Sequence, residues 1–246
     1  MRTIAIGDIH GCALALRTLM DAIAPTPEDT LVFLGDYVDR GPESRDVIDQ
    51  IIALQEQCKV IALRGNHEIM FMGAIAGEME PEMWLRCGGL ATIGSYQDAI
   101  ENIPPEHLQF LTELLPFHET ETTIFVHANY LHDIDMTEQP EQYLYWEHLG
   151  TSAPTPHQSG KRVIVGHSAQ PSGRVLDAGH LICIDTYCFG GRWLTAMDVD
   201  QQTIWQANQE GKLRGEPEPS RLQRFKAWWG ERFGERRLRS PSSAPE

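Results

Sequence analysis

The chain has 246 residues, 41% of them hydrophobic and 22% charged, which are the size and composition of one α/β catalytic domain with a short extension. Its formal net charge of −15 argues against nonspecific nucleic-acid binding, because such binding depends on Lys and Arg neutralising phosphates. The chain has no apolar run near the ~20 residues of a transmembrane segment, no signal-peptide layout and no paired CxxC spacing among its five cysteines, so we expect a cytoplasmic protein without a disulfide framework.

Strands and helices alternate over the first seventy residues. Three short apolar runs predict buried strands at 2–7, 31–34 and 59–63. Apolar residues at helical spacing predict two helices, one over 13–23 and one from Ser44, which can cap it, to about residue 57. This order is typical of a largely parallel sheet with helices packed against it.

The middle of the chain, from Ile69 to about Leu115, is predicted to be mostly helical. Its most distinctive patch runs from Trp84 to Tyr96 and contains a glycine pair between aromatic residues. The patch fits either a helix break within a cap over a site or ordinary core packing, and we favour core packing. From Thr122 onward, short β-rich runs separated by turn residues predict a second sheet stacked on the first.

The last segment, residues 211–246, differs from the preceding domain, 1–210, in being locally basic and bounded by prolines. Trp228, Trp229 and Phe233 predict a short amphipathic helix, and a disordered tail is expected after it. Such a segment can dock on the acidic surface of its own domain, on a partner protein or on anionic lipid, and the sequence does not choose among them.

Polar residues directly follow each of the three early strands, in the motifs GDIHG (7–11), GDYVDRG (35–41) and GNHE (65–68). Because parallel strands present their carboxyl ends at one edge of a sheet, the polar residues of these motifs should converge there. The residues concerned are Asp8, His10, Asp36, Asp39, Arg40, Asn66 and His67. The glycines suit places where the backbone turns sharply and approaches a ligand.

Carboxylates and imidazoles together suit divalent transition metals, and two later strand ends add His127 and His167. A carboxylate shared by two ions holds them ~3.5–4 Å apart, and Asp36, on the middle strand of the three, is the natural bridge. Singly, a histidine at a strand end or an aspartate after glycine is usually an ordinary structural residue. The joint occurrence of five such strand ends nevertheless predicts a metal site.

The three motifs strongly resemble the signature of the calcineurin-like metallophosphoesterases, and GDYVDRG with GNHE resembles the phosphoprotein phosphatase branch, in particular its bacterial serine/threonine protein phosphatase type. The resemblance covers roughly residues 1–200. It implies an α/β fold in which two stacked mixed β-sheets are flanked by helices, the α/β/β/α sandwich of that superfamily.

The resemblance also implies a role for each motif residue. The implied ligands are Asp8 and His10 at the first metal, Asp36 between the two metals, and Asn66, His127 and His167 at the second. His67 would be the general acid, held by Asp39, while Arg40 and Asn66 would bind phosphate oxygens. Two cations would lower the pKa of a shared water so that hydroxide attacks the phosphate near neutral pH. Manganese is the ion expected to support activity, although iron, nickel and zinc also accept such ligands.

The chain departs from the phosphatase pattern in two places, and the place of Tyr187 is open. Where a Gly-rich turn often follows the fourth-motif histidine, the chain has Asn129. Where a second phosphate-binding arginine is usual, it has Glu147 and His148, and the nearby Arg162 is expected to enter the next strand. Tyr187 fits a place by the pocket and a packing role equally well.

Three functions therefore stay open. The leading hypothesis is a metal-dependent phosphomonoesterase acting on phosphorylated protein, with Ser/Thr favoured over Tyr. The runner-up is a symmetrical diadenosine tetraphosphatase, since those enzymes begin with the same GDIHGC run. Against it, those enzymes often lack an aspartate at the position of Asp39, which this chain has. The third is a catalytically inactive phosphate-binding module, which the complete set of proposed ligands argues against.

Overall fold

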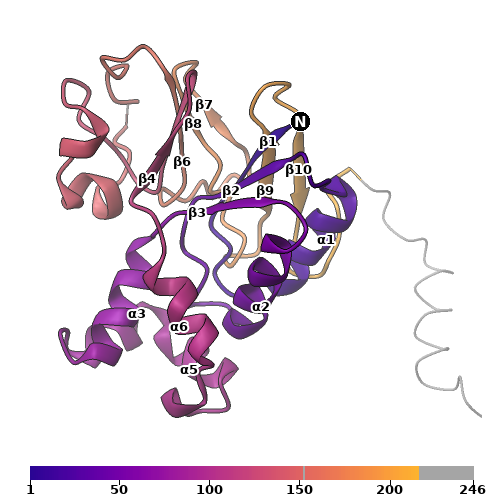
Figure 1. The fold of residues 1–246 in the computed structure, drawn as a ribbon, viewed down its shortest axis with the longest axis vertical. Coiled ribbons are helices and arrows are strands. Elements are labelled where there is room, and N and C mark those ends of the chain that lie inside the picture. Colours follow the sequence, from indigo (N-terminus) through magenta and orange to yellow (C-terminus); the bar gives the residue numbers. More distant parts are fainter. Residues whose placement is uncertain (152, 216–246) are drawn as a thin grey trace, which may run out of the picture. The chain divides into compact units, whose positions relative to one another are not determined.

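The computed structural model describes residues 1–151 and 153–215, and Met1–Arg214 forms one compact unit (Figure 1). The expected helix and tail around Trp228, Trp229 and Phe233 lie outside the described residues. Residues 211–214 still belong to the compact unit, since Leu213 bridges to Ala207.

The first sheet has the strand order β10-β9-β1-β2-β3 (Figure 1). Its strands are β1 (Thr3–Ile6), β2 (Thr30–Phe33), β3 (Lys59–Ala62), β9 (Leu194–Asp198) and β10 (Ile204–Ala207). The first three strands are parallel, as their alternation with helices predicts, whereas β9 runs antiparallel to β1 and β10 antiparallel to β9.

The second sheet has the order β4-β5-β6-β8-β7. Its strands are β4 (Phe117–Glu119), β5 (Thr123–Val126), β6 (Arg162–Val165), β7 (Leu176–Asp177) and β8 (Leu181–Cys183). Strands β5, β6 and β8 are parallel, and the two edge strands pair antiparallel with their neighbours. The prediction that all β-rich runs after Thr122 form this sheet was wrong for the last two, because β9 and β10 return to extend the first sheet beyond β1.

Side chains alternate across each strand and so divide the core into layers. Ile4 and Ile6 of β1 belong to a buried cluster that also contains the apolar faces of α1 (Ala13–Ile23) and α2 (Ser44–Gln55). Ala5, between them, belongs instead to a cluster with Phe125 and Ile164 of the second sheet. The expected arrangement of two stacked mixed sheets flanked by helices is therefore confirmed.

The remaining helices follow β3 in the chain. They are α3 (Asn66–Ala76), α4 (Pro81–Trp84), a π-helical turn (Leu85–Gly89), α5 (Leu90–Ser95), a 3-10 turn (Ile100–Asn102) and α6 (Pro105–Thr112). A 3-10 turn (Met136–Glu138) and a π-helical turn (Gln142–Trp146) lie in the long connection between β5 and β6. Among the residues that the structure describes, every helix is too short or too polar to cross a lipid bilayer.

Ser44 begins α2 but does not cap it. The capping position is Glu43, and no side chain there accepts a hydrogen bond from the helix. The Ser44 hydroxyl instead accepts a hydrogen bond from the backbone N–H of Asp39, at 3.1 Å. Local sequence alone favoured the cap, while the folded chain uses this hydroxyl to hold the neighbouring GDYVDRG turn.

Candidate metal centre

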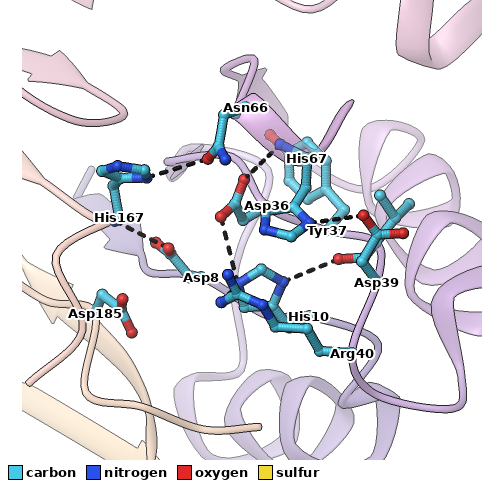
Figure 2. Close-up of polar contacts among 12 residues, drawn as sticks. Asp8, His10, Asp36, Tyr37, Asp39, Arg40, Asn66, His67, His167 and Asp185 are labelled. Atoms are coloured by element: carbon cyan, nitrogen blue, oxygen red, sulfur yellow. Dashed lines mark hydrogen bonds and ion pairs between the residues drawn. The ribbon is translucent and has the colours of Figure 1, made fainter. Parts of the chain in front are cut away.

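Six parallel strands of the two sheets end at a common edge, where the motif side chains gather (Figure 2). Asp8 and His10 follow β1, Asp36 follows β2 and Asn66 follows β3. His127 follows β5 and His167 follows β6, so both sheets contribute donors to the same place. The structure thus brings together the residues that the strand-end argument selected.

Asp36 lies at the centre of these donors. Its Oδ2 is 3.3 Å from Nε2 of His10, and its Oδ1 is 3.4 Å from Nε2 of His127. Two groups of potential ligands, each with donor atoms within 4.8 Å of one another, share this carboxylate: His10, Asp36 and His67 form one, and Asp36, His127 and His167 form the other. One carboxylate between two donor groups is the arrangement that a bridging ligand requires.

Each of the three outer imidazoles is oriented by a backbone carbonyl. Nδ1 of His10 donates to Val38 O at 2.9 Å, and Nδ1 of His127 donates to Leu34 O at 2.8 Å. Nε2 of His167 is 3.2 Å from a further backbone carbonyl, that of Trp146. These bonds leave the opposite ring nitrogen of each histidine facing the centre, which is the outer-shell pattern of metal-binding imidazoles.

Burial keeps these imidazoles neutral, as metal ligation requires. It lowers the pKa of His10 well below its usual value, and it lowers that of His127. The pKa of His167 falls to about 3, through burial and then the nearby His127. Asn66 lies next to two of these histidines, because its Oδ1 is 3.1 Å from Nε2 of His127 and from Nδ1 of His167.

Asp8 is only partly compensated by its surroundings. Burial and the neighbouring carboxylates of Asp185 and Asp36 raise the pKa of Asp8 well above its usual value. Among the residues that the structure describes, Oδ1 of Asp8 is a buried side-chain oxygen without a hydrogen-bond partner. A Cβ on Gly166 would overlap this same oxygen, so the backbone leaves room for it. A buried orphan carboxylate oxygen beside imidazole nitrogens fits a divalent cation.

His67 and Asp39 form a separate buried pair next to this centre. Nδ1 of His67 lies 2.6 Å from Oδ2 of Asp39, and the two side chains are 1% and 0% exposed. Burial lowers the pKa of His67, but the carboxylates of Asp36 and Asp39 raise it by more, and the net shift is upward. The pair is therefore suited to hold a proton for transfer.

Arg40 stands at the mouth of the site. The residue is exposed to solvent, and the Cζ atom of its guanidinium lies 4.4 Å from the centre of the Phe189 ring. Nη1 of Arg40 donates a hydrogen bond to Nε2 of His10 at 2.8 Å. The guanidinium thus reaches the donor cluster, and its remaining N–H groups can face an incoming anion.

Backbone strain is concentrated here. His10, Asp36, Asp39, Arg40 and His167 all have positive φ between 46° and 69°, a conformation that costs non-glycine residues free energy. Such strain persists only where surrounding contacts enforce it. Such a cluster of positive-φ residues at one edge of the fold is typical of a functional site.

Two carboxylates that were not singled out from the sequence belong to the site. Asp185 lies two residues beyond the end of β8 and beside Asp8 (Figure 2), and burial raises its pKa to about 6. The same strand-end pattern that selected the other residues would have found it. Glu68, the last residue of GNHE, accepts hydrogen bonds from the backbone N–H groups of Asp36 and Tyr37 at 2.9 and 2.8 Å.

The positions that depart from the phosphatase pattern have distinct places. The exposed His148 stacks on His167, with ring centres 4.2 Å apart. Arg162 is the first residue of β6, at the opposite end of the strand from His167, so it does not supply a second phosphate clamp. Tyr187 packs on Phe189, and it is Phe189 that contacts His10, at 5.0 Å between ring centres.

Several known proteins resemble this chain. A symmetrical bis(5'-nucleosyl)-tetraphosphatase of Burkholderia pseudomallei is 43% identical over 74 residues, which are 30% of this chain and 26% of that protein. The chain therefore spans about a quarter of the length of this curated relative. Among solved structures, a putative diadenosine tetraphosphatase has a TM-score of 0.66 at 22% identity, with 84% of this chain and 92% of the other covered.

A cold-active protein tyrosine phosphatase has a TM-score of 0.63 at 18% identity, with 87% of this chain and 78% of the other covered. At these identities the two solved structures show a shared fold and do not decide a substrate. A model of the family described as Calcineurin-like phosphoesterase matches residues 1–232. The chain is therefore a member of the calcineurin-like phosphoesterase family, whose enzymes use a dinuclear metal centre.

Proposed function

We propose that this phosphoesterase hydrolyses phosphate monoesters at two divalent cations, and that phosphorylated Ser or Thr side chains of proteins are its favoured substrates. The observation that carries the proposal is the buried Asp39–His67 pair beside the donor cluster. A phosphomonoester with a poor leaving group, such as a serine alkoxide, needs a proton at the moment its P–O bond breaks. A held imidazolium next to the metal-ligating groups supplies that proton.

The proposed ligand assignment combines the strand-end residues Asp8 and Asn66 with histidines of the two donor groups. Asp8 and His10 would hold the first ion, and Asp36 would be shared, since its two oxygens face His10 and His127. Asn66, His127 and His167 would hold the second ion, because their donor atoms meet at about hydrogen-bonding distance. When bound, the two cations lower the pKa of a water molecule and polarise the phosphate. Manganese is the ion proposed for activity in vitro, because oxygen and nitrogen ligands bind it readily.

His67 could in principle join the first ion, because it lies in the same donor group as His10 and Asp36. Its Nδ1 is already occupied by Asp39 at 2.6 Å. The nitrogen left for chemistry is therefore Nε2, and a proton held there can pass to the leaving oxygen. We assign His67 this role rather than ligation.

Arg40 binds the phosphate in this scheme. Its Nη1 donates to Nε2 of His10, the nitrogen that the first ion needs. Because one lone pair cannot serve both partners, His10 would hold an ion only through a nitrogen that Arg40 no longer contacts. The guanidinium is then available to phosphate oxygens, whose spacing its parallel N–H groups match. Asn66 is assigned a second contact to the phosphate through its side-chain amide.

A second candidate function is symmetrical hydrolysis of diadenosine tetraphosphate. The 43% identity over 74 residues to the Burkholderia pseudomallei tetraphosphatase favours it. The nucleotide leaving group is a phosphate, which needs no proton from an imidazolium to depart near neutral pH. The presence of Asp39 at 2.6 Å from His67 therefore favours phosphate monoesters as substrates. The two candidate functions differ in whether this pair must donate a proton to the leaving group.

The deciding experiment is a substrate panel with the full chain and Mn²⁺. Values of kcat/KM are measured for phosphoserine, phosphothreonine and phosphotyrosine peptides and for diadenosine tetraphosphate, with a chelator-treated control. The proposal expects the phosphoserine or phosphothreonine peptide to be turned over best and Asp39→Asn to slow it by about 100-fold, within the range of general acid catalysis. Preferential hydrolysis of the nucleotide, insensitive to Asp39→Asn, would establish the second candidate instead. No turnover with any of several divalent metals would favour an inactive binding module.

A further inference from the structure

Both oxygens of the Asp39 carboxylate are held by side chains from a segment 45 to 53 residues farther along the chain. The indole N–H of Trp84 donates to Oδ1 at 2.9 Å and to Oδ2 at 3.0 Å. The hydroxyl of Thr92 donates to Oδ1 at 2.7 Å. His67 completes the set through Oδ2, so three donors surround a carboxylate that is 0% exposed.

The same segment also holds the backbone of the GDYVDRG turn. The N–H of Asp39 donates to the hydroxyl oxygen of Thr92 at 2.8 Å, and the N–H of Arg40 donates to the carbonyl of Gly88 at 3.2 Å. Asp39 and Arg40 both have φ of 69°, so these bonds support a strained stretch. We call residues 84–92 the brace, because they contact the side chain of Asp39 and the backbone of both residues.

Local sequence explains how the brace reaches its target. Gly88 has φ of 116°, and a Cβ there would lie 2.6 Å from the backbone nitrogen of Arg40. Gly89 packs against the indole of Trp84, where a Cβ would overlap the ring. The glycine pair therefore permits two close approaches, and the π-helical turn between α4 and α5 brings Trp84 and Thr92 to the same carboxylate.

Core packing accounts for only part of this arrangement. Trp84 is 1% exposed and stacks on Phe71 with ring centres 5.0 Å apart, which a phenylalanine could also do. Packing alone does not require an indole N–H aimed at a carboxylate, nor a buried threonine hydroxyl that accepts from and donates to the same residue. These polar contacts all end on the partner of His67.

We propose that Trp84 and Thr92 are positioning residues for the proton donor His67, an inference that rests on the proposed function. Their two donors fix the rotamer of Asp39 and leave Oδ2 aimed at Nδ1 of His67. A carboxylate fixed in this way holds the imidazole plane, so Nε2 stays directed at the leaving oxygen of the substrate. Neither residue contacts the substrate, and both act only through Asp39.

The test compares substrates that differ in their need for a proton. Rates of the Mn²⁺-loaded full chain are measured along a series of aryl phosphates, from 2,4-dinitrophenyl phosphate, whose leaving group departs unaided, to phenyl phosphate. The variants are Trp84→Phe and Thr92→Val, which keep shape but remove a donor, and Thr92→Ser, which restores the hydroxyl. His67→Asn is the benchmark for loss of the acid, and Trp205→Phe, on the edge strand β10, is the matched tryptophan control.

The expected result is a selective loss. Trp84→Phe and Thr92→Val lower kcat for phenyl phosphate by about 10–100-fold, the usual size of an outer-shell effect, and lower it less than about 3-fold for 2,4-dinitrophenyl phosphate. KM and manganese content stay within about 2-fold of the wild type, and Thr92→Ser recovers most of the rate. His67→Asn shows the same dependence on leaving group with a larger loss, and Trp205→Phe shows none.

The outcomes separate this inference from the proposed function. An equal loss on every aryl phosphate, or no loss, while His67→Asn keeps its selectivity, would overturn the positioning role and leave the acid assignment intact. If His67→Asn lost the same activity on every aryl phosphate, both the assignment of His67 as the acid and the positioning role of the brace would be overturned. If Trp84→Phe does not fold, the comparison of Thr92→Val with Thr92→Ser decides, because each changes one small group.

Discussion

Glu68 offers a direct test of how Asp36, the proposed bridging carboxylate, is held. Its Oε2 accepts hydrogen bonds from the N–H groups of Asp36 and Gly65, both at 2.9 Å, and its Oε1 accepts from Tyr37 at 2.8 Å and Val38 at 3.3 Å. In Glu68→Gln, one oxygen becomes an NH₂ group that cannot accept. Whichever oxygen is replaced, two buried N–H groups lose their partner.

The magnitude follows from these bonds. A hydrogen bond to a charged group contributes about 1.5–3 kcal/mol, so losing two costs about 3–6 kcal/mol of unfolding free energy. In a domain of this size that lowers Tm by roughly 10–20 °C. The comparison belongs at pH 8, because burial raises the pKa of Glu68 to about 7 and the carboxylate must be ionised to accept four donors.

The assay is denaturant unfolding of the metal-free full chain, paired with calorimetric Mn²⁺ titration. Glu106→Gln is the matched control, since Glu106 also lies in the first turn of a helix but is exposed to solvent. We expect Glu68→Gln to lose both stability and manganese affinity, and Glu106→Gln to lose neither. A stability change below about 1 kcal/mol in Glu68→Gln would refute the idea that this carboxylate holds the turn.

Three further predictions concern the proposed ligands and one ion pair away from the site. Asp36→Asn should abolish metal content and turnover together, and an active variant would show that the bridge lies elsewhere. Gly166→Ala should weaken manganese binding at least tenfold by titration, because its Cβ overlaps Oδ1 of Asp8; unchanged affinity would contradict that role for Asp8. The hydrogen bond from Arg2, at 2.6 Å, holds the pKa of Asp29 well below its usual value, so its stabilisation is present above about pH 4 and lost as pH falls through the lowered pKa. Asp29→Asn should therefore cost about 1–3 kcal/mol in urea unfolding at pH 7 and progressively less below pH 4, and an equal cost at both would contradict the assignment.

Most of the site could be predicted because its residues obey one local rule. Asp8, Asp36 and Asn66 follow apolar runs that end in glycine, and parallel strands carry such residues to one edge whatever the rest of the fold does. The same rule extends to His127 and His167 on the second sheet. The strand-end rule also applies to Asp185, two residues before Tyr187.

Other features depend on contacts that no local pattern encodes. The sheet to which β9 belongs is decided by the open edge of β1, because a short apolar run pairs equally well with either sheet. The hydrogen bonds from Trp84 and Thr92 to Asp39 join residues 45 and 53 positions apart. A tryptophan and a glycine pair in a helical region indicate packing first, and only the fold reveals the carboxylate that the indole meets.

The central claim is that strand ends from both sheets hold two cations joined by Asp36. The most direct measurement is electron paramagnetic resonance of the chain titrated with Mn²⁺, together with the number of ions bound per chain. The account predicts two ions per chain and a spin-coupled signal that Asp36→Asn removes. A single bound ion, or two ions that give only uncoupled Mn²⁺ signals, would contradict it.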